Sequence, residues 1–84
     1  MKFELIMNLP VRSKKNAEPA LIQRMVVVHQ AQTLKEFTME ISKRPFIVVE
    51  EVFPDAHGSW HNPVSNGEIT VNTFLIGKAR EWKP

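Results

Sequence analysis

Residues 46–53 read FIVVEEVF and carry the strongest strand signal in the chain. β-branched and aromatic side chains favour a pleated backbone because their χ1 freedom is restricted in a helix. The run is apolar on both faces at its start, and Glu50 and Glu51 place an acid on each face near its end. We therefore expect a strand that begins buried and emerges at the margin of a sheet.

A helix is predicted immediately before this strand. Thr33 and Glu36 have the spacing of a capping box, in which the threonine oxygen accepts the N3 amide and the glutamate returns to the cap amide. Pro45 ends the helix, because it disfavours helical geometry at the residue before it. The predicted helix carries one apolar stripe, made of Leu34, Phe37 and Ile41.

Two further strands are predicted upstream. Residues 2–11 and 21–29 alternate between apolar and polar side chains, as half-buried strands do. Between them, residues 12–19 combine turn formers with three cations and lack an apolar period, which indicates an exposed loop. The two strands and this loop are predicted to form a long hairpin.

Downstream of residue 53, a long irregular connection is predicted over residues 54–67, closed by the turn pair Asn66-Gly67. Residues 68–82 begin as a strand, but three consecutive apolar residues at 74–76 cannot obey a period of two. Either a bulge or a tight turn started by the Asn72 and Thr73 side chains resets the alternation.

The order of elements is therefore β-β-α-β-β in a single small domain, residues 1–84. We expect a two-layer α+β fold with a mainly antiparallel sheet and one short helix on one face. One short helix cannot cover both faces of a four-stranded sheet. The uncovered face or the sheet edges are the places where we expect dimerisation or partner binding.

Composition limits the function classes. The chain has no cysteine, which removes disulfides and cysteine nucleophiles and suits a reducing compartment, so the cytoplasm is expected. Neither a signal peptide nor a membrane span is predicted, because an acid at Glu4 interrupts the start and no apolar run reaches about 18 residues. In general character the chain resembles small accessory proteins encoded by bacteria and their phages. No single residue carries that resemblance, and no site follows from it.

Candidate chemistry is concentrated in residues 55–61. Asp55, His57 and His61 are residue types that bind zinc, manganese or iron, although a loop spacing imposes no geometry on them. The alternative is two solvated histidines and an aspartate that caps a turn. Ser59 beside these histidines lacks the strand-turn-helix elbow and oxyanion donors of a hydrolase. We expect no enzyme and no cofactor; a metal-dependent enzyme is the third-ranked function.

The charges are polarised along the chain. Residues 1–45 hold eight cations and four acids, whereas residues 46–84 hold three cations and five acids. A basic hairpin tip can neutralise phosphates, so a nucleic-acid-associated regulator is the alternative function. Its contact residues would be Arg12, Lys14, Lys15, Lys78 and Arg80.

The function predicted first is a small intracellular binding or regulatory protein that acts through protein–protein contacts, with a homodimer expected and no membrane contact. Trp60, in a loop rich in glycine and proline, is the expected interface anchor. The predicted protein interface consists of Glu50, Glu51, Phe53, Asp55, His57 and Trp60.

Overall fold

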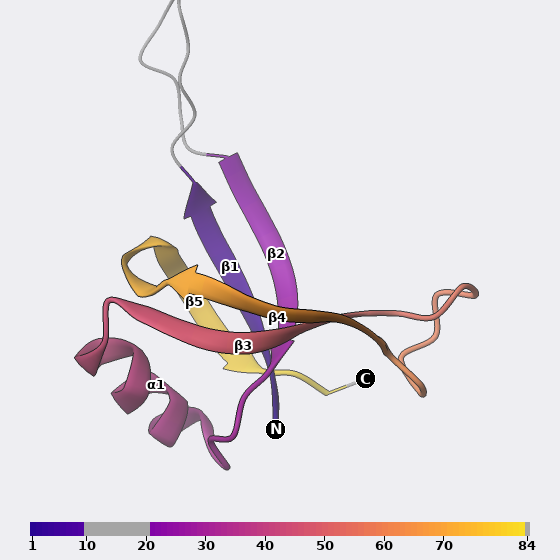
Figure 1. Ribbon diagram of the computed structural model, residues 1–84, viewed down its shortest axis with the longest axis horizontal. Helices are drawn as coiled ribbons and strands as arrows, with labels where there is room; N and C mark the ends of the chain where they lie inside the picture. Colours follow the sequence, from indigo (N-terminus) through magenta and orange to yellow (C-terminus); the bar gives the residue numbers. More distant parts are fainter. Residues whose placement is uncertain (10–20, 84) are drawn as a thin grey trace, which may run out of the picture.

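The computed structural model describes residues 1–9 and 21–83. Within them the elements are β1 (Lys2–Leu9), β2 (Leu21–Val28), α1 (Leu34–Lys43), β3 (Phe46–Phe53), β4 (Val64–Asn72), the 3-10 turn η1 (Thr73–Leu75) and β5 (Ile76–Glu81). The strands form one antiparallel sheet in the order β4-β3-β2-β1-β5 (Figure 1). This confirms the predicted two-layer α+β fold with its β-β-α-β-β order, and a fifth strand follows the predicted four.

The β1–β2 hairpin pairs over eight residues of each strand, from Lys2 opposite Val28 to Leu9 opposite Leu21. Alternation places Phe3, Leu5 and Met7 in the core. The predicted first strand extended to Val11; residues 10–20, which include the predicted loop and its cations Arg12, Lys14 and Lys15, lie outside the described residues.

Helix α1 begins at the predicted cap. Thr33 Oγ1 accepts the Glu36 amide at 3.1 Å, but the Glu36 carboxylate accepts the amide of Gln32 at 2.9 Å in place of the cap amide. Arg44 is already extended, as expected before Pro45. Phe37 is fully buried and stacks on Phe3, with ring centroids 4.2 Å apart. Within the described ranges, no helix has the length and apolarity needed to cross a bilayer.

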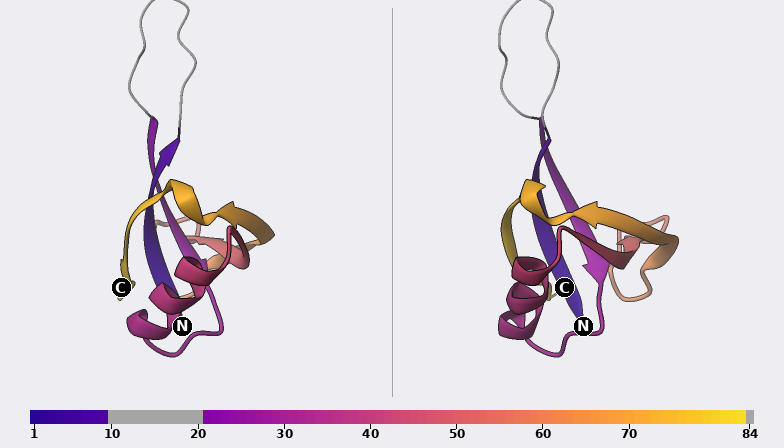
Figure 2. Two further views of the ribbon diagram at one scale, coloured as in Figure 1. Left: turned by 90° about the vertical axis from the view of Figure 1, so that its left-hand side faces the viewer. Right: turned by 60° about the vertical axis from the view of Figure 1, so that its left-hand side comes forward.

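The pairing between β2 and β3 is short, since it joins residues 26–28 to residues 50–52. The β3–β4 ribbon consequently runs across the β1–β2 ribbon, and α1 lies near the start of β1 (Figures 1 and 2). The inner faces of the strands and one side of α1 enclose the core. Its buried members are Phe3, Leu5, Met7, Val27, Ala31, Phe37, Ile47, Val49 and Val71.

Strand β3 has the predicted bounds, but its predicted burial on both faces is wrong. Phe46 and Val48 are more than half exposed, whereas Ile47 and Val49 are buried. The helix and the β1–β2 hairpin cover only the inner face of β3, so the outer side chains at its start remain in solvent.

The connection after β3 is shorter than predicted, since β4 already begins at Val64. The predicted Asn66-Gly67 turn is instead a bulge: these two residues stand opposite Glu51 alone, between the pairs Glu50–Glu68 and Val52–Ser65. Gly67 has φ +88°, a backbone conformation that is unfavourable for any residue with a Cβ atom.

Both predicted ways of resetting the alternation are present: a tight turn at Thr73–Leu75, and a register shift in β5, where Gly77 is the extra residue between the pairs Met7–Ile76 and Ile6–Lys78. Asn72 Oδ1 accepts the Phe74 amide at 3.0 Å, and the Thr73 hydroxyl donates to the carbonyl of Pro45 at 3.1 Å. After this turn β5 pairs antiparallel with β1 at the opposite edge of the sheet from β4.

Candidate binding surfaces

The loop that joins β3 to β4 is organised by Asp55. Its Oδ1 accepts the amides of His57 and Ser59, both at 2.9 Å, and Gly58 at φ +78° allows the chain to close on itself. Asp55 therefore has the turn-capping role, and His57 and His61 are exposed. In the part of the chain that the structure describes, no three side chains of metal-ligand type gather.

Trp60 lies at the end of this loop and is half-buried. Its ring meets that of Trp82, just after β5, edge to face with centroids 5.0 Å apart. The two indoles, with Ser59 and His61, line an open pocket of about 500 Å³. The fold thus joins two tryptophans that are 22 positions apart in the sequence.

The remaining predicted interface residues are spread along β3. Glu50 accepts the Ser65 hydroxyl at 2.6 Å and Glu51 accepts the Asn66 side-chain amide at 3.0 Å, so both acids are tied to β4. Phe53 is exposed and pairs across the ribbon with exposed Val64. These residues and the loop do not form one compact cluster, because β3 spans about 25 Å at 3.3 Å per residue.

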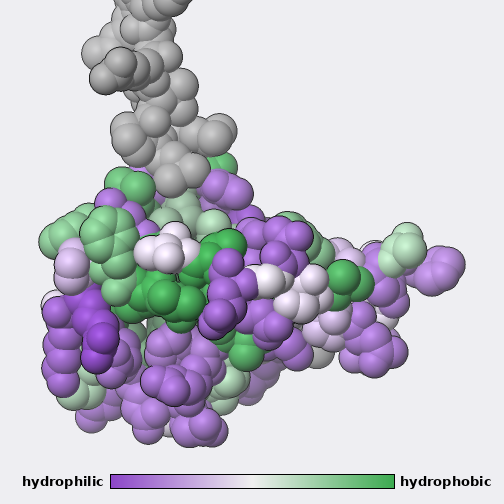
Figure 3. All heavy atoms as spheres, in the orientation of Figure 1, coloured by the Kyte–Doolittle hydropathy of each residue, from purple (hydrophilic) through white to green (hydrophobic). Residues whose placement is uncertain are grey.

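A more compact surface lies at the start of β3. Arg44 is extended, so Arg44, Phe46, Val48 and Glu50 project to one side at alternate positions; we call these four residues the β3 outer row. Its centre is apolar, with Phe46 57% and Val48 56% exposed, and its ends carry opposite charges. Phe74 of η1 is also exposed, and apolar side chains gather over this part of the molecule (Figure 3).

A second surface lies on the outer face of β2, β1 and β5. The strand register sets Ile6 between Arg24 and Lys78, and Glu4 between Val26 and Arg80. We call Lys2, Arg24, Lys78 and Arg80 the β1 basic face. Of the predicted nucleic-acid residues, Lys78 and Arg80 belong to it.

Glu4 is the buried centre of that face, only 5% exposed. Its Oε1 meets Arg80 Nε at 2.9 Å and its Oε2 meets Arg24 Nε at 3.4 Å. Sequence reasoning missed Glu4 and Arg24, because both read as ordinary polar positions of half-buried strands. Only the pairing of three strands shows that one carboxylate holds two arginines.

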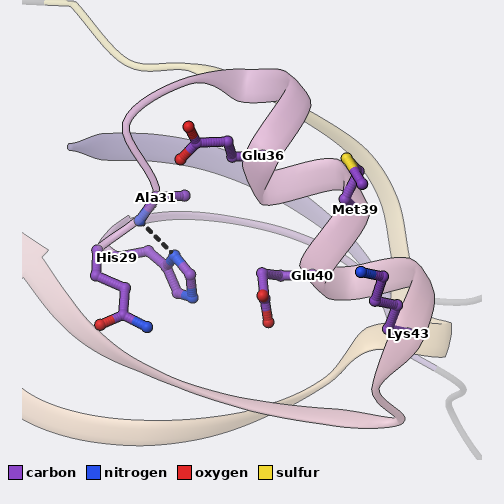
Figure 4. A pocket seen from close by; sticks show the side chains of 7 residues that line it. His29, Ala31, Glu36, Met39, Glu40 and Lys43 are labelled. Atoms are coloured by element: carbon purple, nitrogen blue, oxygen red, sulfur yellow. Dashed lines mark hydrogen bonds between the residues drawn. The ribbon is translucent and has the colours of Figure 1, made fainter.

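A third feature is a pocket of about 320 Å³ between α1 and the end of β2 (Figure 4). His29 Nδ1 accepts the Ala31 amide at 3.0 Å, and its ring meets Phe37 edge to face. Burial lowers the pKa of His29; the Glu40 carboxylate opposes this effect and the N-terminal amine adds to it. The neutral imidazole, which has the acceptor that Ala31 requires, is the form that the fold favours.

Comparisons with protein families, with curated proteins and with solved structures find no match to this chain.

Proposed function

We propose that this chain is a small, non-enzymatic binding protein that acts through protein–protein contacts, and that its partner at the β3 outer row is a second copy of itself. The observation that carries the proposal is the order of side chains along this row: a cation, two exposed apolar residues and an acid. Apolar residues exposed side by side and bordered by charge are typical of association surfaces.

The row is complementary to itself about a two-fold axis. If two copies meet face to face with antiparallel β3 strands, Phe46 of each lies over Val48 of the other. Arg44 then lies over the other copy's Glu50, because positions 44 and 50 are equally far from the centre of the row. An isologous contact of this kind repeats each favourable pair twice.

The charges around Glu50 support the same arrangement. Glu50 stands directly opposite Glu68 in the β3–β4 pair, and like charges at such positions repel each other. Among residues 1–9 and 21–83, the ion pair of Arg44 is with Glu40, at 3.2 Å, and both side chains are exposed. A guanidinium from a second copy would therefore relieve the repulsion between Glu50 and Glu68. Giving up the Arg44–Glu40 pair to do so would cost little stability, since exposed pairs contribute about 1 kcal/mol or less.

The loop geometry supports a non-enzymatic protein. Asp55 Oδ1 is occupied by two backbone amides of its own loop, and the Ser59 hydroxyl accepts the His61 amide at 3.2 Å. In the described part of the chain, the hydrogen bonds of these two groups are made to backbone amides, whereas a nucleophile and its orienting acid would each be hydrogen-bonded to a histidine side chain. The cysteine-free composition suits a reducing compartment, and we propose a cytoplasmic location on that ground.

Sedimentation equilibrium over a range of concentrations tests the proposal. The wild-type protein is expected to approach twice the chain mass of 9.7 kDa as concentration rises. Val48→Glu is expected to abolish the dimer. Val64→Glu is the matched control, because Val64 is 54% exposed and lies at the other end of the same ribbon. A monomer at all concentrations, or equal effects of the two variants, would refute the contact.

A charge exchange tests the two-fold arrangement directly. Arg44→Glu and Glu50→Arg should each weaken the homodimer, because each places like charges opposite each other. A mixture of the two single variants should form heterodimers, since every 44–50 contact then joins opposite charges. If the mixture of Arg44→Glu and Glu50→Arg forms no heterodimer while Val48→Glu still dissociates the wild-type dimer, the copies meet through this face in a different orientation.

A further inference from the structure

The β1 basic face has a construction that differs from a set of solvated surface cations. A buried carboxylate such as Glu4 destabilises the folded state unless it is paired. Moving either arginine away from Glu4 would therefore cost folding free energy, and this keeps both side chains in place. Arg24 and Arg80 come from β2 and β5, the two neighbours of β1, and reach the same carboxylate from opposite sides. The two guanidinium groups are therefore positioned before any ligand arrives.

The geometry leaves most of each guanidinium available. Both contacts to Glu4 are made by Nε, and a guanidinium has four further N–H donors on its terminal nitrogens. Both arginine side chains are more than half exposed. Two arginines against one acid, with Lys2 and Lys78 on the same face, leave three net positive charges over three strands.

Aromatic surface adjoins these cations. The Trp82 amide donates to the Lys2 carbonyl at 2.9 Å, so the β1–β5 pairing continues one residue beyond Glu81. In extended backbone Trp82 shares a face with Arg80, two positions earlier. The open pocket between Trp60 and Trp82 therefore lies at the end of a row of cationic side chains, Lys78 and Arg80.

We infer that the β1 basic face binds single-stranded nucleic acid, with Arg24, Arg80 and Lys78 on phosphates and an unstacked base against the Trp60–Trp82 pair. Cations that follow a backbone, next to aromatic rings on which bases stack, are what sequence-tolerant single-strand binding uses. A duplex keeps its bases stacked and could not use the indole pocket. The inference involves different strands from the β3 outer row and does not depend on the proposed dimer.

Fluorescence anisotropy of the full chain with a labelled 12-nucleotide oligothymidylate tests this inference. Three phosphate contacts predict an affinity that falls with salt, with a slope of log K against log salt of about −2. Lys78→Gln should weaken binding about eight-fold at about 50 mM salt and reduce the slope by about 0.7, because one counterion-releasing contact is lost. Lys35→Gln, which removes an exposed cation from α1, is the matched control and should leave affinity unchanged.

Three comparisons separate single-stranded nucleic acid from other anionic ligands. An abasic oligomer of equal length and a duplex should each bind more weakly than oligothymidylate, and polyglutamate should bind more weakly still. Among the described residues the ion pairs of Glu4 are with Arg24 and Arg80, so substituting Lys78 leaves the buried carboxylate paired; unchanged thermal melting of the variant would confirm this. Absence of binding at low salt, equal effects of Lys78→Gln and Lys35→Gln, or equal affinity for polyglutamate or duplex would overturn the inference.

Discussion

Replacing Phe37 is the sharpest test of how this small domain is held together. Phe37 is fully buried, stacks on Phe3 with an interplanar angle of 9°, and meets His29 edge to face. It is the only fully buried side chain that α1 contributes among the described residues. Phe37→Ala therefore removes the most deeply buried contact between the helix and the sheet, while Leu34 and Ile41 keep their partly buried contacts with the core.

The expected loss is large for a chain of this length. Burial and cavity terms make Phe→Ala in a core cost about 3–5 kcal/mol. A domain of 84 residues has a total free energy of unfolding of about 4–13 kcal/mol, so the substitution removes a quarter of it or more. The melting temperature should fall by more than about 10 °C. Phe37→Leu should cost clearly less, since it keeps most of the apolar volume and loses the aromatic contacts, which contribute about 0.5–1.5 kcal/mol.

Urea unfolding followed by circular dichroism, at one protein concentration, measures these differences. Phe74→Ala is the matched control: Phe74 is 84% exposed, and truncating it should change the free energy of unfolding by about 0.5 kcal/mol or less. If Phe37→Ala and Phe74→Ala unfold at the same urea concentration, α1 does not depend on this contact and the account of the core is wrong.

Two further predictions concern the backbone and pH. Gly67→Ala should lower the free energy of unfolding by about 1–2 kcal/mol in urea titrations, because φ is +88° there although no atom crowds the new methyl group; Gly67→Asn should cost less. An equal loss for both variants would contradict a purely conformational cause. Because burial lowers the pKa of His29 in the folded state, the unfolded state binds its proton more readily, so stability should be level above the ordinary value of 6.5 and decline below it. In thermal melts between pH 8 and pH 5, His29→Gln should flatten part of that decline, and an unchanged pH profile would exclude His29 as its source.

The amino-acid sequence by itself determined the elements whose causes are local. The cap at Thr33, the stop before Pro45 and the bounds of β3 follow from neighbours within a few positions, and the structure has them where the pattern predicts. The stripe on α1 and the alternation in β1 likewise named the inward residues, because a helix and a strand each impose their own period. The turn at Asn72 is also predictable from the sequence, because its side chain accepts the amide of Phe74 only two positions further on.

Tertiary structure alone decided which elements became neighbours. The return of β5 to β1, the bulge at Gly67 and the exposure of Phe46 and Val48 depend on strand pairing between distant residues, which no local period encodes. The same holds for the candidate surfaces: Glu4 gathers Arg24 and Arg80 only because β1 lies between β2 and β5. Trp60 meets Trp82 only because the β3–β4 loop and the end of β5 converge. Pairing of side chains across strands is a property of the register, and the register is set by the whole core at once.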